Sequence, residues 1–191
     1  MDAEEKVRTW GIPLSRGELT LRQAYAQLAE IGVKPDEVPF VVKLMENPDY
    51  KLPGIEIFSG ATHLWTHDQI HILLGRGLLA KDEAFVIGYT MGTTAKIGAT
   101  EEWLFSLVSR FLYPRGYRFS PQDIEVFRDA VRIGFVSRCH DLAKADFAAL
   151  QDLPLRAARE RLNIEEDFLR AYYAIEKRRF PEAFESARLL D

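Results

Sequence analysis

The stretch H-L-W-T-H-D-Q-I-H-I-L-L-G-R-G-L-L-A-K-D-E, from His63 to Glu83, predicts two helices joined by a tight turn. Three of the chain's four histidines follow one another at intervals of four residues: His63, His67 and His71. Residues at that interval are neighbours on one face of a helix. Gly75 and Gly77 then interrupt the helical pattern and predict the turn. Glu83 would therefore return toward the histidines from the next helix.

The same stretch predicts a binding site for a divalent metal ion. Asp68 is three residues from His71, a spacing that also places two side chains on one helical face. Neutral imidazoles and ionised carboxylates are ligands that zinc takes in proteins. The predicted metal ligands, which are also the predicted catalytic residues, are His67, Asp68, His71 and Glu83.

Several roles within this group stay open at the level of sequence. Asp68 could bind the ion directly or orient an imidazole through a hydrogen bond. Glu83 could bind the ion or act as a general base beside a metal-bound water. His63 could be a ligand, a proton shuttle or a hydrogen-bond partner. The alternative to a metal site is an ordinary helix with incidental histidines.

Around this stretch the chain reads as mostly helical, and we expect an all-α fold, a single-domain multi-helix bundle over residues 1–191. Thr20 is placed to cap one helix, and Ser120 with Pro121 and Asp123 strongly indicates the start of another. The segment 81–91 has enough β-branched residues for a strand to compete with a helix. The other predicted helices cover residues 21–31, 35–45, 61–74, 101–112, 121 to 139 or 142, 154–163 and 165–179.

Composition narrows the class of protein. The 47% hydrophobic and 28% charged residues are ordinary values for a globular chain with a buried core. The net charge of −4 gives no support to nucleic-acid binding, which usually needs a basic face. The single cysteine, Cys139, excludes an internal disulfide and fits a reducing compartment. Because no apolar leader or membrane-length apolar run is present, we expect a cytoplasmic protein, with peripheral contact at the inner face of the membrane as an option.

The motif H-D-x-x-H, followed by eleven residues and a glutamate, resembles the signature of the coenzyme Q biosynthesis protein four family, whose members act in ubiquinone biosynthesis. It is filled here, with the family's spacing, by His67, Asp68, His71 and Glu83. The apolar residues and glycine at 72–75 are similar to the family as well. Residues 17–25 resemble its early helix, and residues 152–164 resemble its C-terminal leucine/arginine helix.

This resemblance implies a hydrophobic tunnel for a polyprenyl tail, with the metal site near the aromatic head group. The family's implied activity is the oxidative decarboxylation of a polyprenyl-benzoate, in which a hydroxyl replaces the C1 carboxyl. The metal, zinc or else iron or manganese, would act as a Lewis acid on a phenol or carboxylate. A redox-active metal could also engage oxygen. The implied partners are a polyprenylated aromatic or another isoprenoid lipid and other ubiquinone-biosynthesis proteins.

Three features depart from the family's pattern. Asp82 stands where a glycine usually precedes the glutamate, and Ile87 stands where a lysine is expected. The segment 92–119 has no clear counterpart. These departures indicate a divergent branch, and they affect the identity of the substrate more than the metal site.

Two other functions are compatible with the sequence. A non-catalytic lipid-binding scaffold would use the tunnel together with a closed, structural metal site. A metal-dependent HD-type phosphohydrolase would add the second His-Asp pair, His140 and Asp141, to the first. The aromatic residues that could form the core, line a tunnel or support a homodimer are Trp103, Phe105, Phe111, Tyr113, Tyr117, Phe119 and Phe127.

Overall fold

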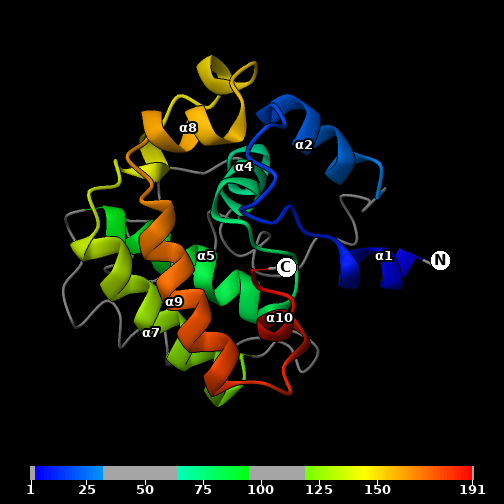
Figure 1. Cartoon of the computed structure of the whole chain (residues 1–191), viewed down its shortest axis with the longest axis vertical. Coiled ribbons are helices and arrows are strands. Elements are labelled where there is room, and N and C mark those ends of the chain that lie inside the picture. Colours follow the sequence, from blue (N-terminus) through cyan, green and yellow to red (C-terminus); the bar gives the residue numbers. More distant parts are fainter. Residues whose placement is uncertain (1–2, 32–63, 95–118, 191) are drawn as a thin grey trace, which may run out of the picture.

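A computed structural model describes residues 3–31, 64–94 and 119–190, and within these ranges the chain is helical without a β-strand (Figure 1). The α-helices are α1 (Ala3–Thr9), α2 (Leu21–Ala29), α4 (Leu64–Leu74), α5 (Ala80–Thr93), α7 (Pro121–Val136), α8 (Leu155–Arg161), α9 (Glu166–Arg179) and α10 (Phe184–Ala187). Two short 3₁₀ turns, η4 (Leu142–Lys144) and η5 (Ala148–Leu150), connect α7 to α8. The described part of the chain confirms the all-α prediction, while the single-domain organisation stays a prediction.

Some predictions fall outside the described residues. They include His63, the helices expected at 35–45 and 101–112, and five residues of the aromatic cluster, from Trp103 to Tyr117. The other two aromatic residues, Phe119 and Phe127, are buried. No helix within the described ranges combines the length and the apolar character that crossing a membrane requires.

Two helices begin where the sequence predicts, each with a reciprocal pair of hydrogen bonds. Thr20 Oγ1 accepts from the Gln23 N–H at 3.2 Å, and the Gln23 side chain accepts from the Thr20 N–H at 2.9 Å. Ser120 and Asp123 make the same exchange at the start of α7, at 3.2 and 2.7 Å. These exchanges satisfy N–H groups that have no partner inside a helix.

Helix α5 lies in the core and is buried over nearly all of its length. The segment 81–91 is therefore helical, and the competing strand does not form. Helix α7 crosses α5 so closely that their backbones touch. A Cβ on Gly92 would lie 2.7 Å from the Phe135 nitrogen and 2.8 Å from the Gly134 Cα, and a Cβ on Gly88 would lie 2.5 Å from the Phe127 carbonyl oxygen. Side chains at these positions would force the two helices apart.

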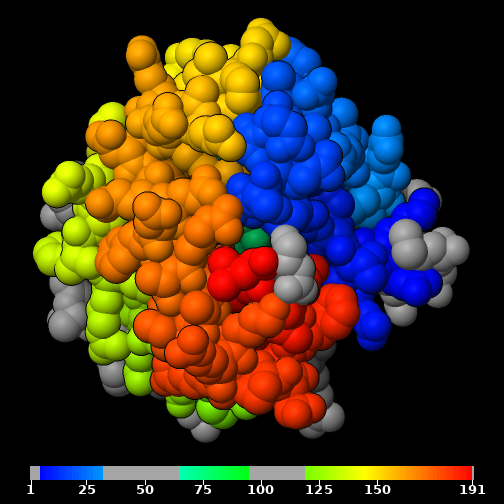
Figure 2. Space-filling model, in the orientation of Figure 1, coloured from blue at the N-terminus to red at the C-terminus, as the bar shows by residue number. Residues whose placement is uncertain are grey.

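The N-terminal segment is joined to the C-terminal third by backbone hydrogen bonds. The Leu21 N–H donates to the Leu153 carbonyl at 3.0 Å, and the Leu155 N–H donates to the Leu19 carbonyl at 2.7 Å. Helices α2 and α8 both pack against α4, as Figure 1 shows. On the face drawn in Figure 2, the N-terminal segment, α9 and α10 leave only a small part of the α4–α5 region visible.

Candidate metal centre

Successive turns of α4 and the first turn of α5 bring three side chains together in the core. His67 and His71 lie one helical turn apart on α4, and Glu83 lies at the start of α5. The Glu83 N–H donates to the Leu79 carbonyl at 2.9 Å, which fixes that first turn. His67 and Glu83 are each 5% exposed, and His71 is fully buried. Together they form a group that could hold a metal ion.

The ligand atoms of these residues face one another at nearly equal distances. The Nε2 atoms of His67 and His71 are 3.3 Å apart. The Glu83 carboxylate straddles them, with Oε2 3.2 Å from His67 Nε2 and Oε1 3.3 Å from His71 Nε2. A tetrahedral zinc ion with bonds of about 2.0–2.1 Å requires neighbouring ligand atoms about 3.3 Å apart. The two Nε2 atoms have this separation, and each is as far from one of the two Glu83 oxygens, so the imidazoles and the carboxylate could share such an ion.

The tautomer of His71 is fixed by its other ring nitrogen. His71 Nδ1 lies 2.6 Å from the Gly77 carbonyl oxygen, inside the protein. A carbonyl oxygen only accepts hydrogen bonds, so Nδ1 must carry the proton and donate it. In the neutral ring, Nε2 then carries a lone pair, and this lone pair points toward Glu83 and His67. Metal-bound histidines are oriented by the same kind of contact.

Electrostatics also favour a cation at this position. Burial opposes ionisation of Glu83, but the adjacent His71 and His67 hold the pKa of its carboxyl well below the ordinary value. Burial favours neutral His71, yet Glu83 raises the pKa of that imidazole above its ordinary value. Glu83 Oε2 is buried, with His67 Nε2 as its polar neighbour at 3.2 Å. An ionised, buried carboxylate that faces two imidazoles is a place where a bound cation would be stabilised.

Asp68, the fourth predicted ligand, lies beside this group but is not one of its members. The group of mutually close ligand atoms contains only His67, His71 and Glu83. Asp68 is half-buried, and burial raises the pKa of its carboxyl to about 6, against the opposing effect of the two histidines. The structure thus brings three of the four predicted ligands together and leaves Asp68 close to them.

The end of α4, which carries His71, is held by side chains from the C-terminal third. The last carbonyls of a helix have no partner within it. Arg159 Nε donates to the Leu73 carbonyl at 2.8 Å, and the Tyr173 hydroxyl donates to the Leu74 carbonyl at 2.5 Å. Helices α8 and α9 therefore fix the position at which α4 stops.

The turn after α4 carries a buried ion pair. Arg76 donates to both oxygens of Glu176 on α9, at 3.0 and 2.5 Å. Its guanidinium carbon lies 3.9 Å from the centre of the Phe85 ring and 4.3 Å from that of Tyr173. The Arg76 N–H also donates to the His71 carbonyl at 3.0 Å. Two-pronged pairing and stacking on aromatic faces suit a buried arginine.

The local sequence pattern predicts no role at this site for Arg76, Arg159, Tyr173 or Glu176. One signal was available: Arg76 is a charged residue between two glycines in an otherwise apolar stretch. A charged side chain in such a stretch indicates either an exposed turn or a buried partner.

The second His-Asp pair lies apart from the metal centre. His140 is exposed and its Nε2 is 2.8 Å from the Asn163 side-chain nitrogen. Asp141 accepts from the Ala143 N–H at 3.1 Å and so caps η4. Neither residue belongs to the described metal-binding group. Cys139 is partly buried, and burial raises the pKa of its thiol to about 12, so it is a poor nucleophile at neutral pH.

Comparisons of the chain with models of known protein families, with curated proteins and with solved structures found no match. The relationship to the coenzyme Q biosynthesis protein four family therefore stays a prediction that rests on the motif residues.

Proposed function

We propose that this chain is a divalent-metal-binding protein of ubiquinone biosynthesis that acts on, or holds, a polyprenylated aromatic compound. The observation that carries the metal-binding part is the buried group of His67, His71 and Glu83, whose facing atoms are 3.2–3.3 Å apart. The resemblance of the motif to the coenzyme Q biosynthesis protein four family supports the substrate class. Zinc suits two imidazoles and a carboxylate, and iron or manganese could take the same ligands.

The chain would hold the ion with three side chains. In a four-coordinate site, three protein ligands leave one position for water or a substrate oxygen. When bound, the ion supplies Lewis acidity that polarises a phenol or carboxylate at that position. The fixed tautomer of His71 would leave its Nε2 lone pair free for the ion, and Glu83 would supply negative charge to balance the ion in the core.

The finer proposal concerns the reaction. Oxidative decarboxylation of the benzoate converts Ar–COOH and half an equivalent of dioxygen into Ar–OH and carbon dioxide. The ring carbon loses its bond to the carboxyl carbon and gains one to oxygen, and dioxygen is the electron acceptor. A hydrophobic tunnel for the polyprenyl tail belongs to this proposal and would place the ring beside His67, His71 and Glu83.

The test is the metal content of the purified protein, with variants of two histidines. We expect about one equivalent of a divalent metal in the unaltered protein, because its ligands make one site. His71→Ala should lose that metal because it removes one ligand and the lone pair facing Glu83. His140→Ala is the matched control, since His140 is exposed and lies outside the metal-binding group. Metal that survives His71→Ala contradicts the proposed site.

Complementation of a ubiquinone-deficient strain tests the biosynthetic part. Growth should be restored by the unaltered protein and by His140→Ala, but not by His71→Ala. If the metal-free variant complements as well as the unaltered protein, then the metal is dispensable and the lipid-binding scaffold explains the function. If the unaltered protein itself fails to complement, the proposed role in ubiquinone biosynthesis is wrong.

A further inference from the structure

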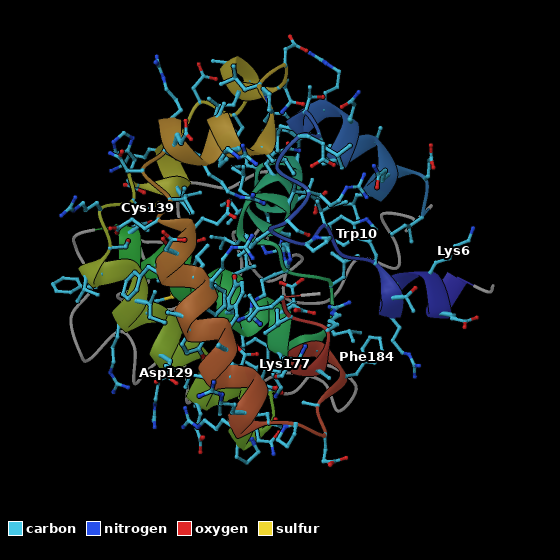
Figure 3. All side chains as sticks on the ribbon, in the orientation of Figure 1. Lys6, Trp10, Asp129, Cys139, Lys177 and Phe184 are labelled. Carbon is cyan, nitrogen blue, oxygen red and sulfur yellow. The ribbon has the colours of Figure 1, made fainter. Side chains whose placement is uncertain are left out.

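Gly77, the hydrogen-bond partner of His71, is enclosed by two other segments of the chain. A Cβ at this position would lie 2.6 Å from the Arg188 guanidinium carbon and 2.7 Å from the Trp10 carbonyl oxygen. The turn that orients His71 is therefore in direct contact with residues from both ends of the described chain. Figure 3 shows Trp10 and Phe184 on the same side of the molecule, where the N-terminal segment meets α10.

Arg188 connects these segments through its guanidinium group. Its Nη1 donates to the carbonyls of Trp10 and Arg8, at 2.8 and 3.1 Å. Its Nη2 donates to the carboxylate of Asp82 in a short ion pair. One side chain thus bridges the N-terminal segment and the start of α5, and its guanidinium group lies against Gly77.

Asp82 is the residue next to Glu83 and is fully buried. Its Oδ2 accepts from the Leu79 N–H at 3.3 Å, so it caps the first turn of α5 as well as pairing with Arg188. Burial raises the pKa of its carboxyl, and the positive charge of Arg188 acts in the opposite direction. The residue that departs from the family's usual glycine therefore has a defined partner in this chain.

We propose that Arg188 and Asp82 are positioning residues of the metal centre. By holding Gly77 and the first turn of α5, they keep the His71 Nδ1–H hydrogen-bonded to the Gly77 carbonyl and keep Glu83 opposite Nε2. Neither residue contacts the ligand atoms themselves, so each acts through the backbone. This inference rests on the proposed metal-binding function, but it makes a separate statement about the tautomer of His71.

The test compares three arginine variants. Arg188→Gln removes the positive charge and the planar guanidinium group. Arg188→Lys keeps the charge but loses the two-pronged donor geometry of the guanidinium. Arg179→Gln is the matched control, because Arg179 is also an arginine that joins two helices through both guanidinium nitrogens, pairing with Glu125 and Asp129 on the surface between α9 and α7. Circular dichroism establishes that each variant is folded before its properties are compared.

Two readouts are recorded for each protein. Zinc affinity is measured by competition with a chelating dye, and the tautomer of His71 is read from its ring ¹⁵N shifts in the metal-free protein at alkaline pH. We expect Arg188→Gln to bind zinc about 10–100-fold more weakly, as for other lost outer partners of a metal ligand. Its His71 ring should no longer be held as the Nδ1–H tautomer. The zinc affinity of Arg188→Lys should lie between that of Arg188→Gln and that of the unaltered protein. Arg179→Gln should match the unaltered protein in both zinc affinity and His71 tautomer.

The outcomes separate this inference from the function on which it rests. The inference is overturned if Arg188→Gln folds and keeps both the zinc affinity and the His71 tautomer of the unaltered protein. It is also overturned if Arg179→Gln loses as much zinc affinity as Arg188→Gln. If the unaltered protein binds no zinc, the metal-binding proposal fails, and the His71 tautomer alone decides whether Arg188 positions that ring. If Arg188→Gln does not fold, Arg188→Lys and Asp82→Asn are judged by the same two readouts.

Discussion

His71 uses its two ring nitrogens for different purposes. Nδ1 donates to the Gly77 carbonyl, and Nε2 faces the Glu83 carboxylate and the second imidazole. The direction of the first contact determines which nitrogen is available for a ligand. The geometry of the metal centre therefore depends on a backbone carbonyl six residues further along the chain.

Zinc affinity should fall as the pH is lowered from about 8 to about 5. Zinc binds the neutral imidazole, so protons compete with it for Nε2. Burial alone would lower the pKa of His71, but Glu83 raises it above the ordinary value, so this competition begins at a higher pH than for an exposed histidine. Zinc titrations at several pH values in this range measure the effect. An affinity that does not change with pH would show that His71 is not a ligand.

At the residue scale, the sequence predicts most of the candidate site because the ligand residues lie close together along the chain. His67 and His71 share a helical face, and a short turn returns Glu83 to them. Asp68 does not join them, because adjacent residues on a helix do not face the same point. Asp68 is still near enough for its pKa to respond to the charges of His67, His71 and Glu83.

At the scale of the elements, the contact between α5 and α7 depends on glycines. Gly88 and Gly92 on α5 and Gly134 on α7 leave no room for a Cβ. The sequence predicts the helix that begins at Pro121 and leaves 81–91 open between helix and strand, and it does not predict this contact. A glycine inside a predicted helix is ambiguous until its neighbour is known, because the glycine lowers helix propensity whether or not another backbone touches it.

Gly92→Ala should destabilise the protein, although alanine is the better helix former by about 1 kcal/mol. The added methyl group would meet the backbone of α7, and overpacking of this kind typically costs about 1–3 kcal/mol. Urea unfolding measures the change in the free energy of unfolding. Gly11→Ala is the control, because a Cβ there would have its nearest neighbour at 3.9 Å. A stability gain in Gly92→Ala would contradict the close contact between the helices.

Which segments form helices was easier to predict from the sequence than which helices pack against each other. The capping residues Thr20 and Ser120 mark helix starts through bonds to residues three positions later, so their signal is local. The segment 81–91 was ambiguous because a core helix is apolar on all sides and loses its helical period. Gly75, with φ of 69°, confirms that the glycine pair marks the turn, since this backbone conformation favours glycine.

At the scale of the whole molecule, metal binding should stabilise the fold. The ligands come from α4 and α5 in the core, so the ion would bind the folded chain in preference to the unfolded one. Free zinc at 100 times its dissociation constant adds about 2.7 kcal/mol to the free energy of unfolding. Thermal unfolding should give a higher Tm with zinc than without it. Excess chelator should return the Tm to the value of the metal-free protein. The same Tm shift in His71→Ala would mean that the ion binds elsewhere.

The residues that hold the turn between α4 and α5 could not be predicted from local pattern. Tyr173 contacts a residue 99 positions away, Glu176 one that is 100 positions away, and Arg188 one that is 106 positions away. Helical spacing, caps and turns are read over a few residues. Pairings over such distances arise only when the elements pack, which is why the ligands were predicted and their supports were not.

The distant supports of the α4–α5 turn also set an order of events during synthesis. A ribosome releases α4 and α5 well before α9 and α10, since translation runs from the N-terminus. Until then, the Leu73 and Leu74 carbonyls and the Arg76 guanidinium have to be hydrated, because their partners do not yet exist. Contacts between remote parts of a chain also form slowly, because a long loop must close first. The histidines and the glutamate are therefore synthesised about 100 residues before Tyr173 and Glu176, which hold the turn between their helices.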